Sequence, residues 1–339
     1  MLGHRLAQLA LGALLLGAGA ACSRRTASPP PYDVGFRGPG RLLVLFESSD
    51  PDIPRKLVVH DRDGAFAIPV ERPEAARWIS SHTLLVSQEL PPEQEYGLSR
   101  TQLLRVDPDS GSVEPFATAA RWFDAEPDPQ GQRLAAGVET DDQGTSELVL
   151  FSLATRGEKP IADAPRALDR PRWSPDGRAL VVLQTVPDPD GADAESSMSF
   201  EGQEVAFPRL FRVSADLSGK TAFLRDGDPG GPLVAGGSLP LWWGPRGVYA
   251  RQRRGLVLCD PAGSGCTLVY APGGEKRVFD GRPCGPDQAL VLVRDHAANA
   301  DAELPQELVR VSLNEGRSEP IYRASGDVFL SAIDWIGAP

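Results

Sequence analysis

Short apolar runs that alternate with turn residues recur along most of the chain. In the most complete unit, Trp173 precedes the turn Pro175-Asp176-Gly177, and the apolar run Ala179–Leu183 follows it. Proline presets φ, aspartate can bond to its own backbone and glycine accepts a positive φ, so these residues favour a tight turn. The unit is therefore predicted to form strand, turn, strand. After residue 22 no segment has the periodicity of an amphipathic helix.

Degraded copies of this unit occur on both sides of it. Trp78 and Trp243 keep the aromatic residue, and Pro129 and Pro286 keep the turn proline. The apolar runs that follow these turns are Leu84–Val86, Leu134–Ala136, Val248–Ala250 and Ala289–Val293. Repetition with a period of about 40–50 residues is typical of propellers and solenoids, in which one unit cannot bury its own apolar face.

The sixth copy is split between the two ends of the chain. Gly38-Pro39-Gly40 leads into Leu42–Phe46 with no strand before it, whereas Val328–Ile333 lead into Trp335. A circular array must join its last unit to its first, because otherwise two strand edges stay exposed. The C-terminal segment is therefore predicted to be the innermost strand of the N-terminal unit. Trp335 is expected to fill the core between neighbouring units.

Each unit also contains two outer strands. Lys56–His60 and Ala65–Val70 flank a turn that contains glycine, which is a hairpin pattern. Equivalent outer strands are predicted at Leu103–Val106, Val113–Ala117, Leu148–Leu153, Leu210–Val213, Leu256–Leu258 and Leu308–Val311. The interval from Pro175 to Pro245 is too short for two units, so it is predicted to hold one blade and an insertion from about Val186 to Phe207. The chain is thus expected to be an all-β, six-bladed propeller over residues 38–339, closed by pairing of its N- and C-terminal strands.

The motif Trp173-Ser174-Pro175-Asp176-Gly177 and its five copies resemble the repeat of the TolB-like six-bladed β-propeller family, over roughly residues 38–339. The resemblance implies a periplasmic or extracellular propeller that binds protein. No counterpart of the separate α/β domain of TolB itself is recognised. The motif residues are expected to be structural parts of the blades: Trp78, Trp173, Pro175, Asp176, Gly177, Trp243 and Trp335.

The N-terminal sequence predicts that the protein is located in the bacterial cell envelope. His4 and Arg5 precede the apolar run Leu6–Ala21, which ends in small residues, as in a secretory signal peptide over residues 1–21. Cys22 follows at once and resembles the lipidated cysteine of bacterial lipoproteins, although Gly19 stands where that pattern usually has leucine. The alternatives are a plain signal peptide with an incidental cysteine, or a retained membrane anchor. Residues 22–37, rich in proline, are predicted to be a tether between the lipid and the propeller.

Charge and cysteine usage fit an exported protein. The net charge of −11 argues against a nucleic-acid partner, which needs clustered basic residues. Cys259 and Cys266 bracket a turn between two predicted strands, where a cross-strand disulfide is geometrically possible. Cys284 has no partner if Cys22 carries a lipid, and is expected to be a buried thiol.

Catalytic motifs are missing from the sequence. There is no nucleophile elbow, metalloprotease motif or phosphate-binding loop. His60, His82 and His296 lie far apart in sequence and are expected to be ordinary surface or core histidines. The acidic runs Asp188–Glu195 and Asp141–Gly144 lack the spacing of a calcium loop and are interpreted as solvated loops. The insertion Val186–Phe207 is the best candidate for contact with a partner.

The sequence therefore favours a monomeric, lipid-tethered propeller that binds or scaffolds a protein, peptidoglycan or glycan, with no catalytic, cofactor or metal residues. The rival hypothesis is a propeller hydrolase, of lactonase or phosphoesterase type, with a metal in the central channel. That activity requires acidic and amide side chains from several blades to converge on the axis.

Overall fold

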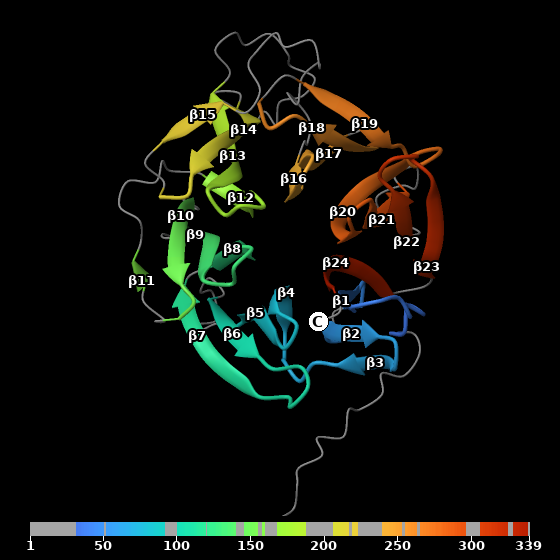
Figure 1. Cartoon of the computed structure of the whole chain (residues 1–339). Coiled ribbons are helices and arrows are strands. Elements are labelled where there is room, and N and C mark those ends of the chain that lie inside the picture. Colours follow the sequence, from blue (N-terminus) through green and yellow to red (C-terminus); the bar gives the residue numbers. More distant parts are fainter. Residues whose placement is uncertain are drawn as a thin grey trace, which may run out of the picture.

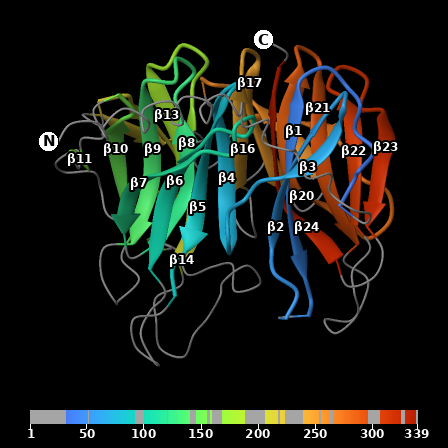
Figure 2. The same ribbon diagram turned by 90° about the horizontal axis from the view of Figure 1, so that it is seen from below.

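The computed structural model describes residues 32–50, 52–91, 100–119, 121–139, 146–154, 158–159, 168–187, 206–216, 219–222, 239–252, 255–262, 265–295, 306–324 and 328–337. Six four-stranded antiparallel sheets surround a central axis as the blades of a propeller (Figure 1). Seen from the side, the strands run roughly along that axis (Figure 2). The all-β, six-bladed architecture predicted from the repeats is confirmed.

The strands are given from the axis outward. Blade 1 contains β24 (Val328–Ile336), β1 (Arg41–Ser48), β2 (Lys56–Asp61) and β3 (Gly64–Ala67). Blade 2 contains β4 (Pro73–Ser80), β5 (Thr83–Glu89), β6 (Thr101–Val106) and β7 (Val113–Ala119). Blade 3 contains β8 (Arg121–Pro127), β9 (Arg133–Glu139), β10 (Ser146–Ser152) and β11 (Glu158–Lys159). Blade 4 contains β12 (Leu168–Trp173), β13 (Ala179–Pro187), β14 (Ala206–Ser214) and β15 (Lys220–Ala222). Blade 5 contains β16 (Leu239–Gly244), β17 (Gly247–Gln252), β18 (Gly255–Cys259) and β19 (Cys266–Tyr270). Blade 6 contains β20 (Lys276–Gly285), β21 (Gln288–Asp295), β22 (Gln306–Ser312) and β23 (Ser318–Ala324).

The ring closes as the split repeat predicts. β24 pairs antiparallel with β1, from Arg41 opposite Ile336 to Ser48 opposite Val328. Trp335 lies opposite Leu42, but its side chain is only half-buried, and its Nε1 donates to the carbonyl of Pro39 at 3.2 Å. Trp335 therefore covers the end of the core rather than filling its centre.

The packed structure also extends N-terminally of Gly38. Tyr32, Val34 and Phe36 are buried, at alternate positions of an extended segment. They join an apolar cluster with residues such as Leu290 and Leu308 of blade 6. This segment therefore seals the junction between the first and last blades, where the ring is joined by pairing rather than by chain continuity.

The turn of the central motif is held by its own side chains. Ser174 Oγ donates to Asp176 Oδ1 at 2.6 Å and accepts from the amide of Ala179 at 2.9 Å. Gly177 has a φ of +68°, which disfavours any residue with a Cβ. Trp173 is buried, and its Nε1 donates to the carbonyl of Glu126 in blade 3 at 3.0 Å. The motif thus fixes both a turn and a contact between blades.

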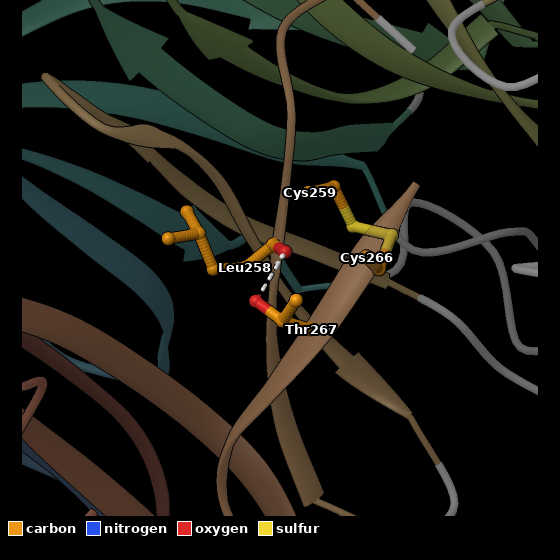
Figure 3. The surroundings of a disulfide bond; sticks show 4 residues. All are labelled: Leu258, Cys259, Cys266 and Thr267. Atoms are coloured by element: carbon orange, nitrogen blue, oxygen red, sulfur yellow. Dashed lines mark hydrogen bonds between the residues drawn. A yellow bond between two sulfur atoms is a disulfide. The ribbon is translucent and has the colours of Figure 1, made fainter. Parts of the chain in front are cut away.

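Cys259 and Cys266 form the expected disulfide between β18 and β19. The two residues pair directly in the strand register, with Cα atoms 4.0 Å apart (Figure 3). Cys284 is a free, half-buried thiol.

Each innermost strand carries a β-bulge. The register shifts lie between Pro73 and Ala75, Phe123 and Glu126, Asp169 and Arg172, Pro240 and Trp242, Val278 and Asp280, and Leu330 and Ala332. Asp124 and Arg170 lie inside two of these bulges with φ of 43° and 52°, values rarely adopted by residues with side chains. A bulge redirects the side chains of its strand, so these irregularities determine what faces the channel.

Candidate functional site: a charged ring on the axis

The residue that precedes the Trp position of the repeat comes from the innermost strand of every blade. Around the axis from blade 1 to blade 6, these residues are Asp334, Arg77, Glu126, Arg172, Trp242 and Arg282. We call them the axial ring. The charges alternate in sign except at Trp242. Five members are buried, with exposed fractions of 2–8%, namely Arg77, Arg172, Trp242, Arg282 and Asp334.

Glu126 is the centre of this ring. Its Oε2 lies 3.5 Å from Nε of Arg77, 3.7 Å from Nη1 of Arg172 and 3.8 Å from Nη2 of Arg282. Arg282 belongs to blade 6, on the opposite side of the axis from blade 3 (Figure 1). Side chains from opposite blades therefore meet, and they close the channel at this level.

Asp124 forms a second point of convergence next to the ring. Its carboxylate lies 3.4 Å from Arg77, 3.6 Å from Arg170 and 3.7 Å from Arg172. Burial alone would raise the pKa of Asp124, but the neighbouring guanidinium groups, with Arg172 the strongest, outweigh it and hold the pKa well below its usual range. Asp124 is therefore a carboxylate that balances three arginines.

Asp334 connects blade 1 to both neighbours. Its Oδ2 accepts the backbone N–H of Trp78 in blade 2 at 2.7 Å, and its Oδ1 lies 3.3 Å from Nε of Arg282 in blade 6. Burial raises the pKa of Asp334 more than Arg282 and Arg77 lower it. The last strand is thus attached to the ring by charge as well as by β-pairing.

The ring position of blade 5 is the uncharged Trp242, and a backbone carbonyl of this blade accepts hydrogen bonds from the neighbouring ring arginines. Trp242 stacks on Tyr249, with ring centroids 4.5 Å apart. The carbonyl of Leu241 accepts from Nε of Arg172 at 2.8 Å and from Nη1 of Arg282. At Gly281 a Cβ would come within 3.2 Å of the Trp242 ring, so the absence of a side chain lets blades 5 and 6 approach closely.

The arrangement balances charge rather than presenting reactive groups. Glu126, Asp124 and Asp334 each lie within 3.5 Å of at least one guanidinium nitrogen. A divalent cation at these carboxylates would have to displace or approach those positive charges. Across the described residues, no group of three or more His, Cys, Asp or Glu side chains is arranged to hold a metal ion.

The structure does not bring His60 and His82 together, because they lie in blades 1 and 2 at unrelated positions. His60 lies on β2, fully buried, with Nδ1 3.7 Å from Asp33 and with no hydrogen bond to either ring nitrogen from the described residues. His82 is exposed at the turn after β4, 3.1 Å from Asp109. His296 lies outside the described residues, as do Cys22, both acidic runs and residues 188–205 of the predicted insertion.

The axial ring was not predicted, although the sequence contains its signal. Aligning the repeats by their turns places four of these residues three positions before the turn anchor: Arg77, Glu126, Arg172 and Trp242. Arg282 is shifted by one residue, and Asp334 is placed by the tryptophan that follows it. In sequence, however, an isolated Arg or Glu at a strand end is typical of a solvated position.

No protein-family model and no curated protein matches the chain. Among solved structures, TolB from Acinetobacter baumannii superposes with a TM-score of 0.54 at 14% identity, over 87% of this chain and 66% of that chain. A putative TolB from Agrobacterium tumefaciens gives 0.55 at 15% identity, over 89% of this chain and 100% of that chain. A chain of a nidogen/laminin complex gives 0.55 at 11% identity, over 88% of this chain and 98% of that chain. At these identities the likeness extends to the propeller fold, including a resemblance to TolB propellers.

Within the described part of the chain, no helix has the length and apolar character needed to cross a bilayer.

Proposed function

We propose that this protein is a non-catalytic binding propeller of the bacterial cell envelope, tethered to the membrane by a lipid on Cys22. The observation that carries the non-catalytic part of the proposal is the contact of Glu126 with Arg282 across the axis, at 3.8 Å. The tether rests on the position of Cys22 directly after the apolar run Leu6–Ala21. A channel hydrolase needs acidic side chains free to hold a metal or activate water. Here the acids that converge on the axis are engaged by arginines.

The fold itself is compatible with this role. One structure of similar fold comes from a nidogen/laminin complex, in which proteins associate. The described turns connect paired strands of four-stranded blades, which form a rigid framework for them. A rigid scaffold that carries exposed turns is the usual basis of a binding module.

The test combines a search for activity with a search for a ligand. The full chain is assayed against lactone and phosphoester substrates with and without added Mn²⁺, Ca²⁺ and Zn²⁺, and is also immobilised to retain components of an envelope extract. We expect no hydrolysis, and a retained protein or glycan that binds again after purification, as measured by calorimetry. Metal-dependent hydrolysis that disappears in Asp124→Asn would overturn the proposal in favour of the hydrolase.

The tether is tested separately. Metabolic labelling with a fatty acid is expected to mark the parent chain and to miss Cys22→Ser, which should also become soluble. Cys284→Ser is the matched control, since it removes a thiol from the folded part of the chain and should keep both the label and the membrane association. Release of the parent chain by high salt alone would contradict lipid attachment.

A further inference from the structure

Three arginines form a cluster next to the axial ring. Arg251 and Arg294 both lie against the ring of Phe279, and burial and the neighbouring charge of Arg170 lower the pKa of Arg251. Arg170 lies on β12, Arg251 on β17 and Arg294 on β21, so they come from three consecutive blades. β12 runs toward the turn of its repeat, and Arg170 lies before the ring residue Arg172 on this strand. β17 and β21 run away from the turns of their repeats, and Arg251 and Arg294 lie near the ends of these strands that are farthest from the turns. The cluster is therefore on the side of the ring that faces away from the turns of the repeat.

Two of these arginines are fixed by backbone carbonyls. Arg251 Nη1 donates to the carbonyl of Phe279 at 2.7 Å, and Arg294 Nη2 donates to the carbonyl of Leu330 at 3.0 Å. Both acceptors lie at the bulges of β20 and β24. Nε of Arg294 is buried and has no hydrogen-bond partner among the described residues. The guanidinium groups are thus preorganised by neutral acceptors, and one N–H remains unsatisfied.

Phe279 packs against both guanidinium groups. Cζ of Arg294 lies 3.3 Å from its ring centroid and Cζ of Arg251 lies 5.3 Å from it. Cζ of Arg294 also lies 5.7 Å from the ring centroid of Phe329. The cluster is therefore both cationic and lined by aromatic side chains.

The carboxylates near the cluster are already engaged. Asp280 accepts the backbone amides of Gly281 at 2.8 Å and Ile333 at 3.1 Å. Asp124 lies 3.6 Å from Arg170 of the cluster and is shared with Arg77 and Arg172 of the ring, and Glu47 lies 3.5 Å from Nε of Arg55. Burial, opposed by Glu47 and reinforced by Arg251, lowers the pKa of Arg294 to about 10. Arg251 and Arg294 thus hold like charges close together, and perturbed charged groups of this kind occur at ligand sites as well as in structural networks.

We propose that the Arg170–Arg251–Arg294 cluster binds the carboxylates of an acidic peptide segment of a partner protein. Guanidinium groups recognise carboxylates through paired, charge-assisted hydrogen bonds. The cluster spans three blades and so presents several donors along an extended chain. A glycan is less well matched, because sugars stack on a free aromatic face and Arg294 occupies a face of Phe279. This inference rests on the proposed binding function and names the ligand class.

The probe is a fluorescein-labelled peptide of six glutamates, titrated with the full chain and followed by anisotropy. Because the chain carries a net charge of −11, general electrostatics repel this probe, and binding therefore reports a local cationic site. We expect binding that weakens as salt is raised. We also expect a loss of about tenfold or more in Arg294→Gln and Arg170→Gln. A peptide of six glutamines is expected not to bind.

Arg246→Gln is the matched control. Arg246 lies in the turn between β16 and β17 of blade 5, with a side chain 45% exposed, outside the cluster. It should bind like the parent. Arg170, whose side chain is 37% exposed, provides a test that does not depend on a buried substitution, and thermal melting verifies that each variant is folded.

Three outcomes would overturn the inference. They are no binding by the folded parent, equal binding by the Arg170 and Arg246 variants, or stronger arginine-dependent binding of an oligouronate than of the peptide. If the folded parent does not bind the peptide but binds another ligand from the envelope extract, the cluster proposal is wrong and the proposed binding function is still supported. If metal-dependent hydrolysis is found, the proposed function fails whatever the peptide does.

Discussion

Glu126 and Arg282 come from opposite blades, yet Oε2 of one lies 3.8 Å from Nη2 of the other on the propeller axis. Each blade places one residue of its innermost strand next to the axis, and the long side chains of Glu126 and the ring arginines meet there. The channel is closed there by an ion-pair network. The network also links blades that share no backbone hydrogen bonds.

Glu126→Gln tests this network. The substitution keeps the shape but removes the charge that faces three arginines, and leaving buried charges uncompensated is strongly destabilising. Because the Glu126 side chain is 19% exposed, we expect a loss of about 2–3 kcal/mol, which is roughly 4–10 °C in melting temperature. Glu319→Gln removes a 74% exposed carboxylate 3.8 Å from Arg310 and should change stability by less than about 0.5 kcal/mol. Equal melting of both variants would contradict a structural role of the ring.

His60 predicts a pH dependence of stability. Burial lowers its pKa from 6.5 to about 4, so the unfolded chain binds this proton more readily than the folded chain. Stability is therefore fully present above pH 6.5 and falls as the pH drops toward 4, by about 2–3 kcal/mol. Denaturant unfolding between pH 4.5 and 7 measures the slope. His60→Gln should flatten it, whereas His82→Gln, which removes an exposed imidazole, should keep it. A slope unchanged in His60→Gln would exclude this residue as its source.

Closure of the ring predicts an order of effects within β24. Leu330 is fully buried, so Leu330→Ala should lower the free energy of unfolding by about 3 kcal/mol. Trp335 is only half-buried, so Trp335→Ala should lower it less, by about 2 kcal/mol. Deletion of residues 328–339 removes the innermost strand of blade 1 and exposes the edge of β1, so the protein should aggregate. A soluble deletion variant with an unchanged melting transition would mean that the ends of the chain do not need to pair.

The disulfide and the free thiol predict a specific chemical pattern. Peptide mapping without reductant should find Cys259 linked to Cys266. Replacing both cysteines by serine should lower the free energy of unfolding by about 2–3 kcal/mol. The effect is modest because a short closed loop restricts the unfolded chain less than a long one. Burial raises the pKa of Cys284 to about 11, so iodoacetamide should modify it slowly in the folded chain and quickly in denaturant. Rapid modification of the folded chain, or Cys284 in a disulfide, would contradict this structure of blades 5 and 6.

The sequence alone determined the blades and their closure. Pro175-Asp176-Gly177 and its copies specify turns through local backbone preferences, and alternating apolar runs specify the strands between them. The split repeat that ends at Trp335 implied that the chain ends must pair. The Cys259–Cys266 pair followed equally from two strands joined by a turn. The turns, the strands and the disulfide hairpin are local features, and closure follows from the repeat pattern, so their signals can be read from a single sequence.

Only the tertiary structure decided which charged residues meet. Glu126 and Arg282 are far apart in sequence, and each alone looks like a solvated strand end. They become partners because six bulged strands converge on one axis and direct the same register position inward. The burial of His60 and the half-exposure of Trp335 likewise depend on how the first and last blades pack together. Burial and charge pairing are properties of the assembled ring, and no single repeat contains them.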